Sequence, residues 1–412
     1  MTSRLLILLM VLSMFKFGCF GQTENYWEKT TDFGSTFIGE GLKRERAVAF
    51  SINGFGYIGT GIDTAEVVHR DFWKFNPTNS VWTQIADVPG AVRRNAIAFS
   101  IGNSGYVGTG INTVNSSDAG ATILNDFWEY NSIFNTWVQK ANFPGGNGSG
   151  TYFSTGFSID SKGYICGGKM GPNNYSNQLW EYKPSINQWA QLANFPGGNR
   201  YQLSSFTIGF KAYVGLGTDQ DLYRNDIWEF NASTNQWSAK ASLPSSARAG
   251  SATFSIGSRG YVCMGVNGGL LDDLWEYNPF NDEWLVKSDY GGSQRKYAVG
   301  FSIDDIGYVG TGKGYSGKKS SFYKYYPSTV LGLQELSANI KVYPNPVVST
   351  LQIETSSDII ERIEIHSFTG ELIFTSKFEH KIDVSTLTSG SYLLIAMTKN
   401  NQIVSSEKFI KH

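Results

Sequence analysis

Five arginines occupy one repeated position in this sequence. Each stands six residues before a phenylalanine in a segment ending Phe-Ser-Ile or nearly so: Arg44, Arg93, Arg200, Arg248 and Arg295. The remaining unit of the repeat has Thr151 at this position. Guanidinium groups donate paired hydrogen bonds in a fixed fork, which matches carboxylates and phosphates. If the chain arranges its repeats around one axis, the five arginines lie at similar height and can form a binding site for an acidic ligand.

A second interpretation of the same arginines is structural. Each guanidinium can donate hydrogen bonds to loop carbonyls of its own repeat unit, and both interpretations stay open at this point. The loops that follow the glycine clusters, notably 62–70 and 111–125, are expected to open on the same face. Loops on a rigid scaffold carry most binding, so ligand selection is expected there.

Other reactive residues are scarce. His69 is the only one of the four histidines that lies within the repeats, which argues against most histidine-dependent catalysis and against a multi-histidine metal centre. Cys166 and Cys263 occupy equivalent positions two units apart, too far for a disulfide. We therefore expect no metal site and no cofactor, and the sequence identifies no catalytic residue.

The repeat has a period of about 50 residues. A tyrosine follows each repeat phenylalanine by seven residues, as in Phe50 and Tyr57, across a turn rich in Gly, Asn, Asp or Ser. This spacing predicts a hairpin of two strands, after which comes a glycine cluster. Two further strands each carry a tryptophan, nine residues apart in five units: Trp73/Trp82, Trp128/Trp137, Trp180/Trp189, Trp228/Trp237 and Trp275/Trp284. Four strands per unit follow from this pattern.

The sixth unit lacks its second tryptophan, because Gly332 stands at the expected position. Trp27 is the only one of the 11 tryptophans outside the five pairs, in a segment 25–29 that resembles a fourth strand. We infer that this N-terminal strand completes the last sheet. The two ends of the ring would then be joined by hydrogen bonds, with no open sheet edge.

This pattern of hydrophobic strand, glycine pair, then Tyr or Trp and Trp at fixed offsets resembles kelch repeats over residues 23–327. Several units read Gly-Thr-Gly in place of Gly-Gly, as at 59–61. The resemblance implies an all-β fold: a six-bladed kelch-type β-propeller over residues 22–330, closed by an N-terminal strand. A copper radical oxidase of the galactose oxidase type, also built on kelch repeats, needs ligating histidines that are absent here.

After a linker at 331–340 the composition changes, and residues 341–412 are expected to form a small β-sandwich of alternating apolar strands. Its segments include Pro344-Asn345-Pro346, Gly390-Ser391-Tyr392 and a final stretch from Lys408. In order and spacing they resemble the C-terminal sorting domain of the type IX secretion system of Gram-negative bacteria. The resemblance implies export with that machinery as a partner. The alternative is an ordinary sandwich appendage, such as a carbohydrate-binding one.

Composition and the N-terminus bound the remaining possibilities. The chain has 412 residues, with 34 basic and 35 acidic side chains and a formal charge of -1, so it has no field that would attract nucleic acid. Residues 1–21 resemble a cleaved signal peptide, with Arg4 before an apolar run; lipidation of Cys19 is the alternative. No later segment approaches the length of a transmembrane helix. We expect a secreted or outer-surface protein of a Gram-negative bacterium.

Three functions fit this sequence. The first is a secreted or cell-surface binding protein for a glycan or a protein. The second is a sugar-acting enzyme, since a six-bladed kelch ring resembles the sialic acid mutarotases and clustered arginines suit a sugar carboxylate. The third is a purely structural extracellular component.

Overall fold

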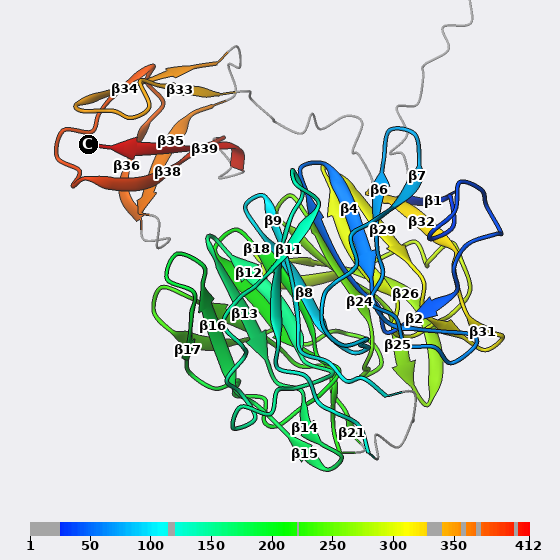
Figure 1. The fold of residues 1–412 in the computed structure, drawn as a ribbon. Coiled ribbons are helices and arrows are strands. Elements are labelled where there is room, and N and C mark those ends of the chain that lie inside the picture. Colours follow the sequence, from blue (N-terminus) through cyan, green and yellow to red (C-terminus); the bar gives the residue numbers. More distant parts are fainter. Residues whose placement is uncertain are drawn as a thin grey trace, which may run out of the picture. The chain divides into compact units, whose positions relative to one another are not determined.

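The computed structural model describes residues 25–113, 120–220, 222–327, 340–355, 360–367, 372–398 and 403–412, which form strands, turns and loops (Figure 1). They divide into two compact units, one spanning Asn25–Pro327 and a smaller one within residues 340–412. The predicted signal peptide 1–21 and all but the last residue of the predicted linker 331–340 lie outside the described residues.

The larger unit contains six four-stranded antiparallel sheets. Their innermost strands are β3 (Val48–Ile52), β8 (Ile97–Ile101), β12 (Thr155–Ile159), β18 (Ser204–Ile208), β24 (Ala252–Ile256) and β28 (Val299–Ile303). The second strands are β4 (Phe55–Gly59), β9 (Ser104–Gly108), β13 (Lys162–Cys166), β19 (Lys211–Gly215), β25 (Arg259–Asn267) and β29 (Ile306–Gly310). We number the sheets one to six in this order.

The outer half of each sheet carries the tryptophans. The third strands are β6 (Phe72–Asn76), β10 (Phe127–Asn131), β16 (Leu179–Lys183), β22 (Ile227–Asn231), β26 (Gly269–Asn278) and β32 (Phe322–Tyr326). The outermost strands are β7 (Val81–Ile85), β11 (Thr136–Gln139), β17 (Gln188–Gln191), β23 (Gln236–Lys240), β27 (Glu283–Lys287) and, in sheet six, β1 (Tyr26–Thr30).

The innermost strands surround a central channel. Each packs beside the next in the order β3, β8, β12, β18, β24, β28 and back to β3. Alternation along a strand decides which side chains line the channel. In β3, Phe50 and its apolar neighbours are buried between sheets, whereas Ala49 and Ser51 face the channel. The small residues at these positions leave a cavity of about 490 Å³ along the axis.

The N-terminal strand completes sheet six. β1 pairs antiparallel with β32, with Trp27 opposite Tyr325, as the position of Trp27 predicts. The Trp27 Nε1 donates to the carbonyl of Ser288, at the end of sheet five, over 3.0 Å. The fourth-strand tryptophan of each other sheet makes the same bond to the preceding sheet: Trp82 to Thr31, Trp137 to Ala86, Trp189 to Ala141, Trp237 to Ala193 and Trp284 to Ala241.

Contacts between neighbouring sheets explain a repeated glycine. The phenylalanine of each innermost strand packs over the residue that precedes the repeat tyrosine of the next sheet. A Cβ added to Gly56 would lie 2.3 Å from the ring of Phe301, and one added to Gly105 would lie 2.2 Å from the ring of Phe50. A Cβ at Gly56 or Gly105 would therefore force the facing ring to shift, because cores are close-packed, whereas sheet four accommodates the buried Ala212 at this position.

One end of the strand bundle carries short two-stranded sheets. Three are hairpins that connect second to third strands: β14 (Lys169–Gly171) with β15 (Asn174–Tyr175), β20 (Thr218–Asp219) with β21 (Leu222–Tyr223), and β30 (Lys313–Gly314) with β31 (Gly317–Lys318). The fourth pairs β2 (Arg44–Glu45), which precedes the innermost strand of sheet one, with β5 (Ile62–Asp63), which follows the second strand. In sheet five the strands β25 and β26 themselves extend to a tip at 267–269. We call this end of the unit the cap face. The Asn-rich turns between third and fourth strands lie at the opposite end.

The smaller unit is a sandwich of two sheets around one apolar core. One sheet has β33 (Lys341–Tyr343), β34 (Thr350–Glu354) and β37 (Lys381–Asp383). The other has β36 (Leu372–Lys377), β35 (Arg362–Ser367), β38 (Gly390–Met397) and β39 (Ile403–Lys411). Asn345 ties the first segment to β39, because its side-chain amide donates to the Lys408 carbonyl at 3.0 Å and accepts from the Ile410 N–H at 2.9 Å.

Candidate functional site

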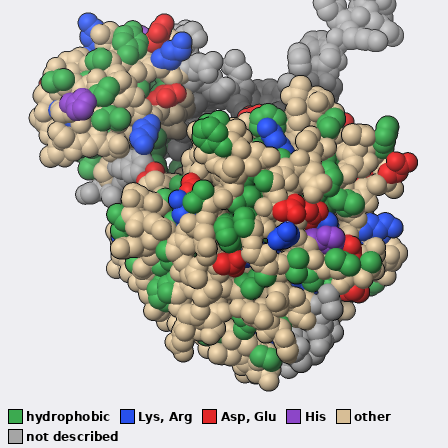
Figure 2. Space-filling view, in the orientation of Figure 1, with side chains coloured by type: hydrophobic (Ala, Val, Ile, Leu, Met, Phe, Trp, Pro, Cys, Tyr) green, Lys and Arg blue, Asp and Glu red, His purple; other side chains and the backbone are tan. Residues whose placement is uncertain are grey.

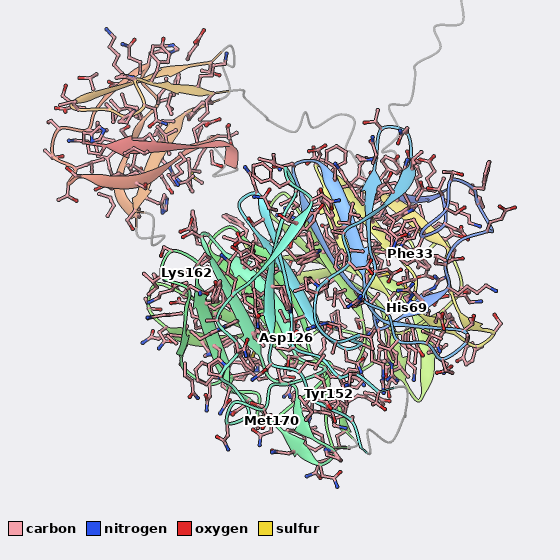
Figure 3. All side chains as sticks on the ribbon, viewed as in Figure 1. Phe33, His69, Asp126, Tyr152, Lys162 and Met170 are labelled. Atoms are coloured by element: carbon pink, nitrogen blue, oxygen red, sulfur yellow. The ribbon has the colours of Figure 1, made fainter. Side chains whose placement is uncertain are left out.

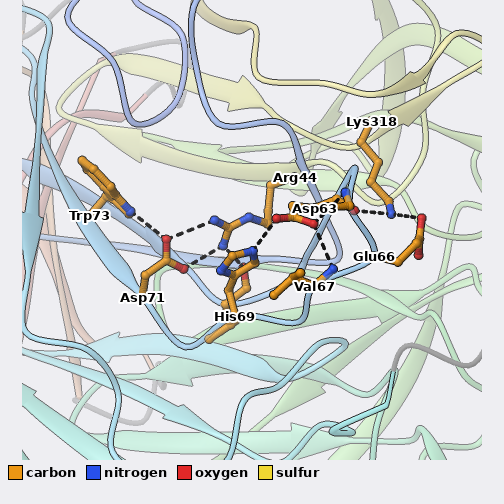
Figure 4. Close-up of polar contacts among 10 residues, drawn as sticks. Arg44, Asp63, Glu66, Val67, His69, Asp71, Trp73 and Lys318 are labelled. Carbon is orange, nitrogen blue, oxygen red and sulfur yellow. Dashed lines mark hydrogen bonds and ion pairs between the residues drawn. The ribbon is translucent and has the colours of Figure 1, made fainter.

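The five repeated arginines lie at the cap face, with at most 4% of each residue exposed. Arg44 shows their geometry (Figure 4). Its Nη1 donates to the Thr60 carbonyl and to Asp71 Oδ1, both at 2.7 Å, and its Nη2 donates to Asp71 Oδ2 at 3.0 Å. Three further pairs of the same kind connect Arg93 to Asp126, Arg200 to Asp226 and Arg248 to Asp273.

In two of these pairs, those of Asp71 and Asp273, the arginine lowers the pKa of the aspartate. Burial alone would raise the pKa of Asp71, but the hydrogen bonds and positive charge of Arg44 outweigh it and lower that pKa. The same balance lowers the pKa of Asp273 beside Arg248. In addition, the third-strand tryptophan donates its Nε1 to the same carboxylate, as Trp73 does to Asp71 at 2.9 Å. The pair thus fixes the start of the innermost strand to the third strand.

Two sheets depart from this pattern. In sheet three both partners differ, since Thr151 replaces the arginine and Gln178 stands where the aspartate would be. In sheet six Arg295 keeps its place, 1% exposed, but meets Ser321 in place of a carboxylate, with 3.1 Å between Nη2 and Oγ. The aspartates were missed in the sequence analysis, although an Asp two residues before the third-strand tryptophan is visible in four units.

The five guanidinium groups are thus engaged within their own sheets. Each donates to a loop carbonyl of its own sheet, and four of the five also pair with an aspartate, whereas Arg295 meets Ser321. Ligand binding by these five arginines themselves stays a prediction.

A closed ring of backbone hydrogen bonds lies next to the arginines and encircles the channel axis. Its six members follow the repeated arginine position by two residues: Arg46, Asn95, Phe153, Gln202, Gly250 and Tyr297. All have φ between 53° and 63°. Each N–H donates to the carbonyl of the preceding member, and the Arg46 N–H closes the circle on Tyr297 at 3.2 Å. We call these residues the cap ring.

The side chains of the cap ring meet across the axis. The Arg46 guanidinium lies 5.3 Å from the ring centroid of Phe153 and 4.8 Å from that of Tyr297. These two rings come from sheets three and six, on opposite sides of the channel, yet their centroids are 5.9 Å apart. The Tyr297 hydroxyl accepts from Gln202 at 3.0 Å. Gly250 makes room for Tyr297, because a Cβ there would lie 2.8 Å from its ring. Together these side chains cover the cap end of the channel.

A tyrosine cluster flanks the cap ring at sheets three and four. Tyr175 and Tyr201 stack with their centroids 5.0 Å apart and their planes 12° from parallel. The Lys169 ammonium lies 5.2 Å from the Tyr201 centroid and 5.4 Å from that of Tyr152. Figure 3 places Tyr152 with β14 at the cap end of sheet three, whereas Lys162 lies at the other end of the same sheet. Stacked aromatic faces beside a cation are suited to the apolar faces and polar rims of a ligand such as a sugar.

Charged residues gather at sheets one and six of the cap face, near His69 (Figures 2 and 4). The His69 Nε2 lies 2.8 Å from Asp63 Oδ2. Burial would raise the pKa of Asp63, but hydrogen bonds from the Val67 N–H and from His69 lower it. Lys318, 5% exposed, reaches Glu66 Oε1 at 2.5 Å and lies 3.8 Å from the buried Glu45.

No group of three or more His, Cys, Asp or Glu side chains in the described ranges could hold a metal ion. Burial raises the pKa of both Cys166 and Cys263 thiols, so neither is a thiolate nucleophile at neutral pH. Within the same ranges, no helix is long and apolar enough to cross a membrane.

Family models of known proteins match part of the larger unit and nearly the whole range of the smaller one. Residues 150–306 match the family model described as the KLHDC2/KLHL20/DRC7 Kelch-repeats domain. Residues 341–412 match the secretion system C-terminal sorting domain. The chain thus carries a kelch-repeat domain and, at its C-terminus, a sorting domain. The predicted kelch repeats and sorting domain, and the all-β, kelch-type propeller fold class of this kelch protein, are thereby confirmed.

A solved structure, described as the structure of YjhT, resembles the kelch protein with a TM-score of 0.56 and 18% sequence identity. The match covers 70% of this chain and 94% of that chain, and it supports the fold alone. No curated protein matches the sequence.

The predicted sorting residues of the kelch protein have structural roles in its smaller unit. Besides the contacts of Asn345, Tyr392 is buried, donates from its hydroxyl to the Thr388 carbonyl at 2.8 Å, and stacks on Phe409. Gly390 begins β38 opposite Lys411, and Lys408 lies in β39 opposite Leu393. Pro344 and Pro346 flank Asn345. The motifs therefore converge on the last strand.

Proposed function

We propose that this kelch protein is a secreted or cell-surface binding protein that holds an extracellular glycan or protein on its cap face. The observation that carries the proposal is the meeting of aromatic and charged side chains at the axis, where Arg46, Phe153 and Tyr297 contact one another. Binding sites commonly combine such aromatic surface with a few polar groups. The stacked pair Tyr175 and Tyr201 extends this surface toward the hairpins.

The sorting domain supports export and a secreted or cell-surface location, with the secretion machinery as a partner. That the surface in question is the outer surface of a Gram-negative bacterium belongs to the proposal. So does a glycan or protein as the ligand. A sugar-acting enzyme and a purely structural component remain the two competing functions, and the experiment below separates all three.

A glycan array tests this function. We expect the full-length kelch protein to bind a defined subset of glycans, and we expect Tyr201→Ala to reduce the signal at least ~10-fold because stacking with the ligand is lost. Phe280→Ala is the matched control, since Phe280 is 74% exposed in a turn at the opposite end of the strands.

Equal loss in both variants would contradict a cap-face site. If no glycan binds, an array of extracellular proteins is probed with the same two variants. Conversion of a bound free sugar, followed by NMR, would favour the enzyme, and silence in every assay would favour the structural component.

A further inference from the structure

Arg46 differs from the five repeated arginines in how its donors are used. Those five give their N–H groups to carbonyls and to Asp or Ser oxygens. The Arg46 guanidinium makes no hydrogen bond to any described residue, and its nearest carboxylate oxygen, on Glu45, is 3.9 Å from Nε. Its Nε is buried without a partner, as are those of Arg44, Arg93 and Arg200, but unlike theirs its Nη groups have no hydrogen-bond partner among the described residues, and its side chain keeps 20% of its accessibility. A partly exposed guanidinium whose Nη groups meet no protein acceptor can donate to a ligand that replaces the water on them.

The surroundings of Arg46 fix the direction from which a ligand can approach. Phe153 and Tyr297 both hold the guanidinium by cation–π contact. The rings offer no oxygen or nitrogen acceptor other than the Tyr297 hydroxyl, which makes no hydrogen bond to Arg46, so these contacts leave the N–H donors of Arg46 without such a partner. The rings also limit its rotation. What remains is a fork of donors held in place, which suits the two oxygens of a carboxylate.

The surroundings of Arg46 carry an excess of positive charge, which also favours an anionic ligand. Lys296 and Lys313 are paired through their backbones at the edge of sheet six, and the Lys296 ammonium lies 5.0 Å from the same Tyr297 ring that Arg46 contacts. Burial lowers the pKa of Lys296, and repulsion from Arg46 lowers it further. Neither lysine side chain forms an ion pair with a described residue. Among the described residues, the carboxylate that lies near Arg46 is that of Glu45, which also faces Lys318.

We propose that Arg46 and Lys296 form a binding site for the carboxylate group of a ligand, with Arg46 as the forked donor and Lys296 as the second charge. This inference rests on the proposed function and adds to it the class of ligand: the cap face selects acidic molecules. It also moves the acidic-ligand site from the five repeated arginines, which are already paired, to the cap ring. A ligand carboxylate would satisfy the Arg46 donors and offset the positive charge at the axis.

Titration with small probes tests the carboxylate site in the full-length protein. The probes are D-glucuronate, its uncharged counterpart D-glucose, and acetate, each followed by ligand-observed NMR and calorimetry. We expect D-glucuronate to bind at least ~10-fold more tightly than D-glucose. We expect Arg46→Gln to reduce the affinity for D-glucuronate by roughly 10- to 100-fold, the size of a charge-assisted bidentate contact. Binding of acetate as well would identify the carboxylate, and not the sugar, as the recognised group.

The control is Arg259→Gln, which removes the same charge at the far end of the strands, where Arg259 is paired with Glu276. It should leave the affinity for D-glucuronate unchanged. Arg46→Lys keeps the charge but loses the fork, so an intermediate affinity is expected, and this variant serves if Arg46→Gln does not fold. Equal binding of D-glucuronate and D-glucose, unchanged in Arg46→Gln, would overturn the carboxylate site and leave the proposed binding function standing. No binding of D-glucuronate or acetate to the wild type would also overturn it.

Discussion

At the scale of residues, the arginines of the cap face fall into two groups that differ in their contacts. Arg44 and Arg46 are separated by one residue, yet Arg44 is paired with Asp71 while Arg46 lies between two aromatic rings. A paired and buried guanidinium stabilises the loop that carries it, and removing one partner leaves a buried charge. An aromatic-held guanidinium with unused donors is arranged for a ligand. Context therefore decides the role.

The pH dependence of ligand affinity follows from Lys296. Burial and the charge of Arg46 lower its pKa, so its charge is lost at a lower pH than that of an exposed lysine, near 10.4. Affinity for D-glucuronate should therefore be highest where Lys296 is protonated and should fall as the pH rises through this lowered pKa. Calorimetry across roughly pH 6 to 10 measures this. Lys296→Gln should bind more weakly and lose the dependence; a profile unchanged in that variant would assign the titration to another group.

The cap ring could not have been found by residue type. Its members are Arg46, Asn95, Phe153, Gln202, Gly250 and Tyr297, which share a left-handed backbone and no common side chain. Positive φ is usual for Gly and Asn but costs energy for Phe, Gln or Tyr, so their sequence gives no turn signal. The ring of hydrogen bonds compensates for this strain. By contrast, the repeated arginines could be recognised in the sequence. Each makes the same contact to a loop carbonyl in its own sheet, and this contact favours the same residue type each time.

At the scale of elements, the tryptophan spacing was sufficient to predict the four strands of each sheet. It also predicted that the N-terminal segment supplies the outermost strand of sheet six. The reason is that each fourth-strand tryptophan has one fixed partner, a carbonyl of the preceding sheet, and Trp27 makes this bond to Ser288. The short hairpins such as β14–β15 and β20–β21 were not predicted as strands, because they are two or three residues long and carry no alternating pattern.

Removal of β1 tests how much the ring depends on its closure. A variant lacking residues 23–31 loses the pairing with β32 and the tryptophan bond, and exposes the buried face of Tyr325. We expect the thermal midpoint to fall by roughly 5–10 °C or more, measured by calorimetry. Trp27→Phe keeps the strand but not the indole donor, so a smaller decrease is expected. An unchanged midpoint in the deletion variant would show that the pairing contributes little to stability.

At the scale of the whole molecule, the smaller unit matches a secretion sorting domain, and the proposed function assigns binding to the larger unit. The smaller unit has its own apolar core, and its sorting residues hold the C-terminal strand in place. The larger unit offers the cap face. Fold and family follow from the repeats and from the sorting motifs, whereas the identity of the ligand depends on a few side chains at the axis.

Deletion of residues 341–412 tests this division. We expect the truncated protein to stay in the periplasm, because the sorting domain is lost, while the purified larger unit keeps the glycan-binding pattern of the full-length chain. Fractionation and the same array measure both outcomes. Surface display of the truncated form would contradict the assigned role of the domain. Reattachment of the segment at the same site is the control.

The cap ring has one electrostatic consequence. Its six N–H···O bonds all run the same way round the axis, from each member to the one before it. Dipoles that circulate in this manner point along the circumference and sum to about zero across the channel. The backbone, which often creates an anion site at a helix start, is thus neutral here. The side chains therefore set whether the cap end of the channel attracts anions or cations. Substitutions of these side chains can reverse that preference while the backbone hydrogen bonds of the cap ring stay in place.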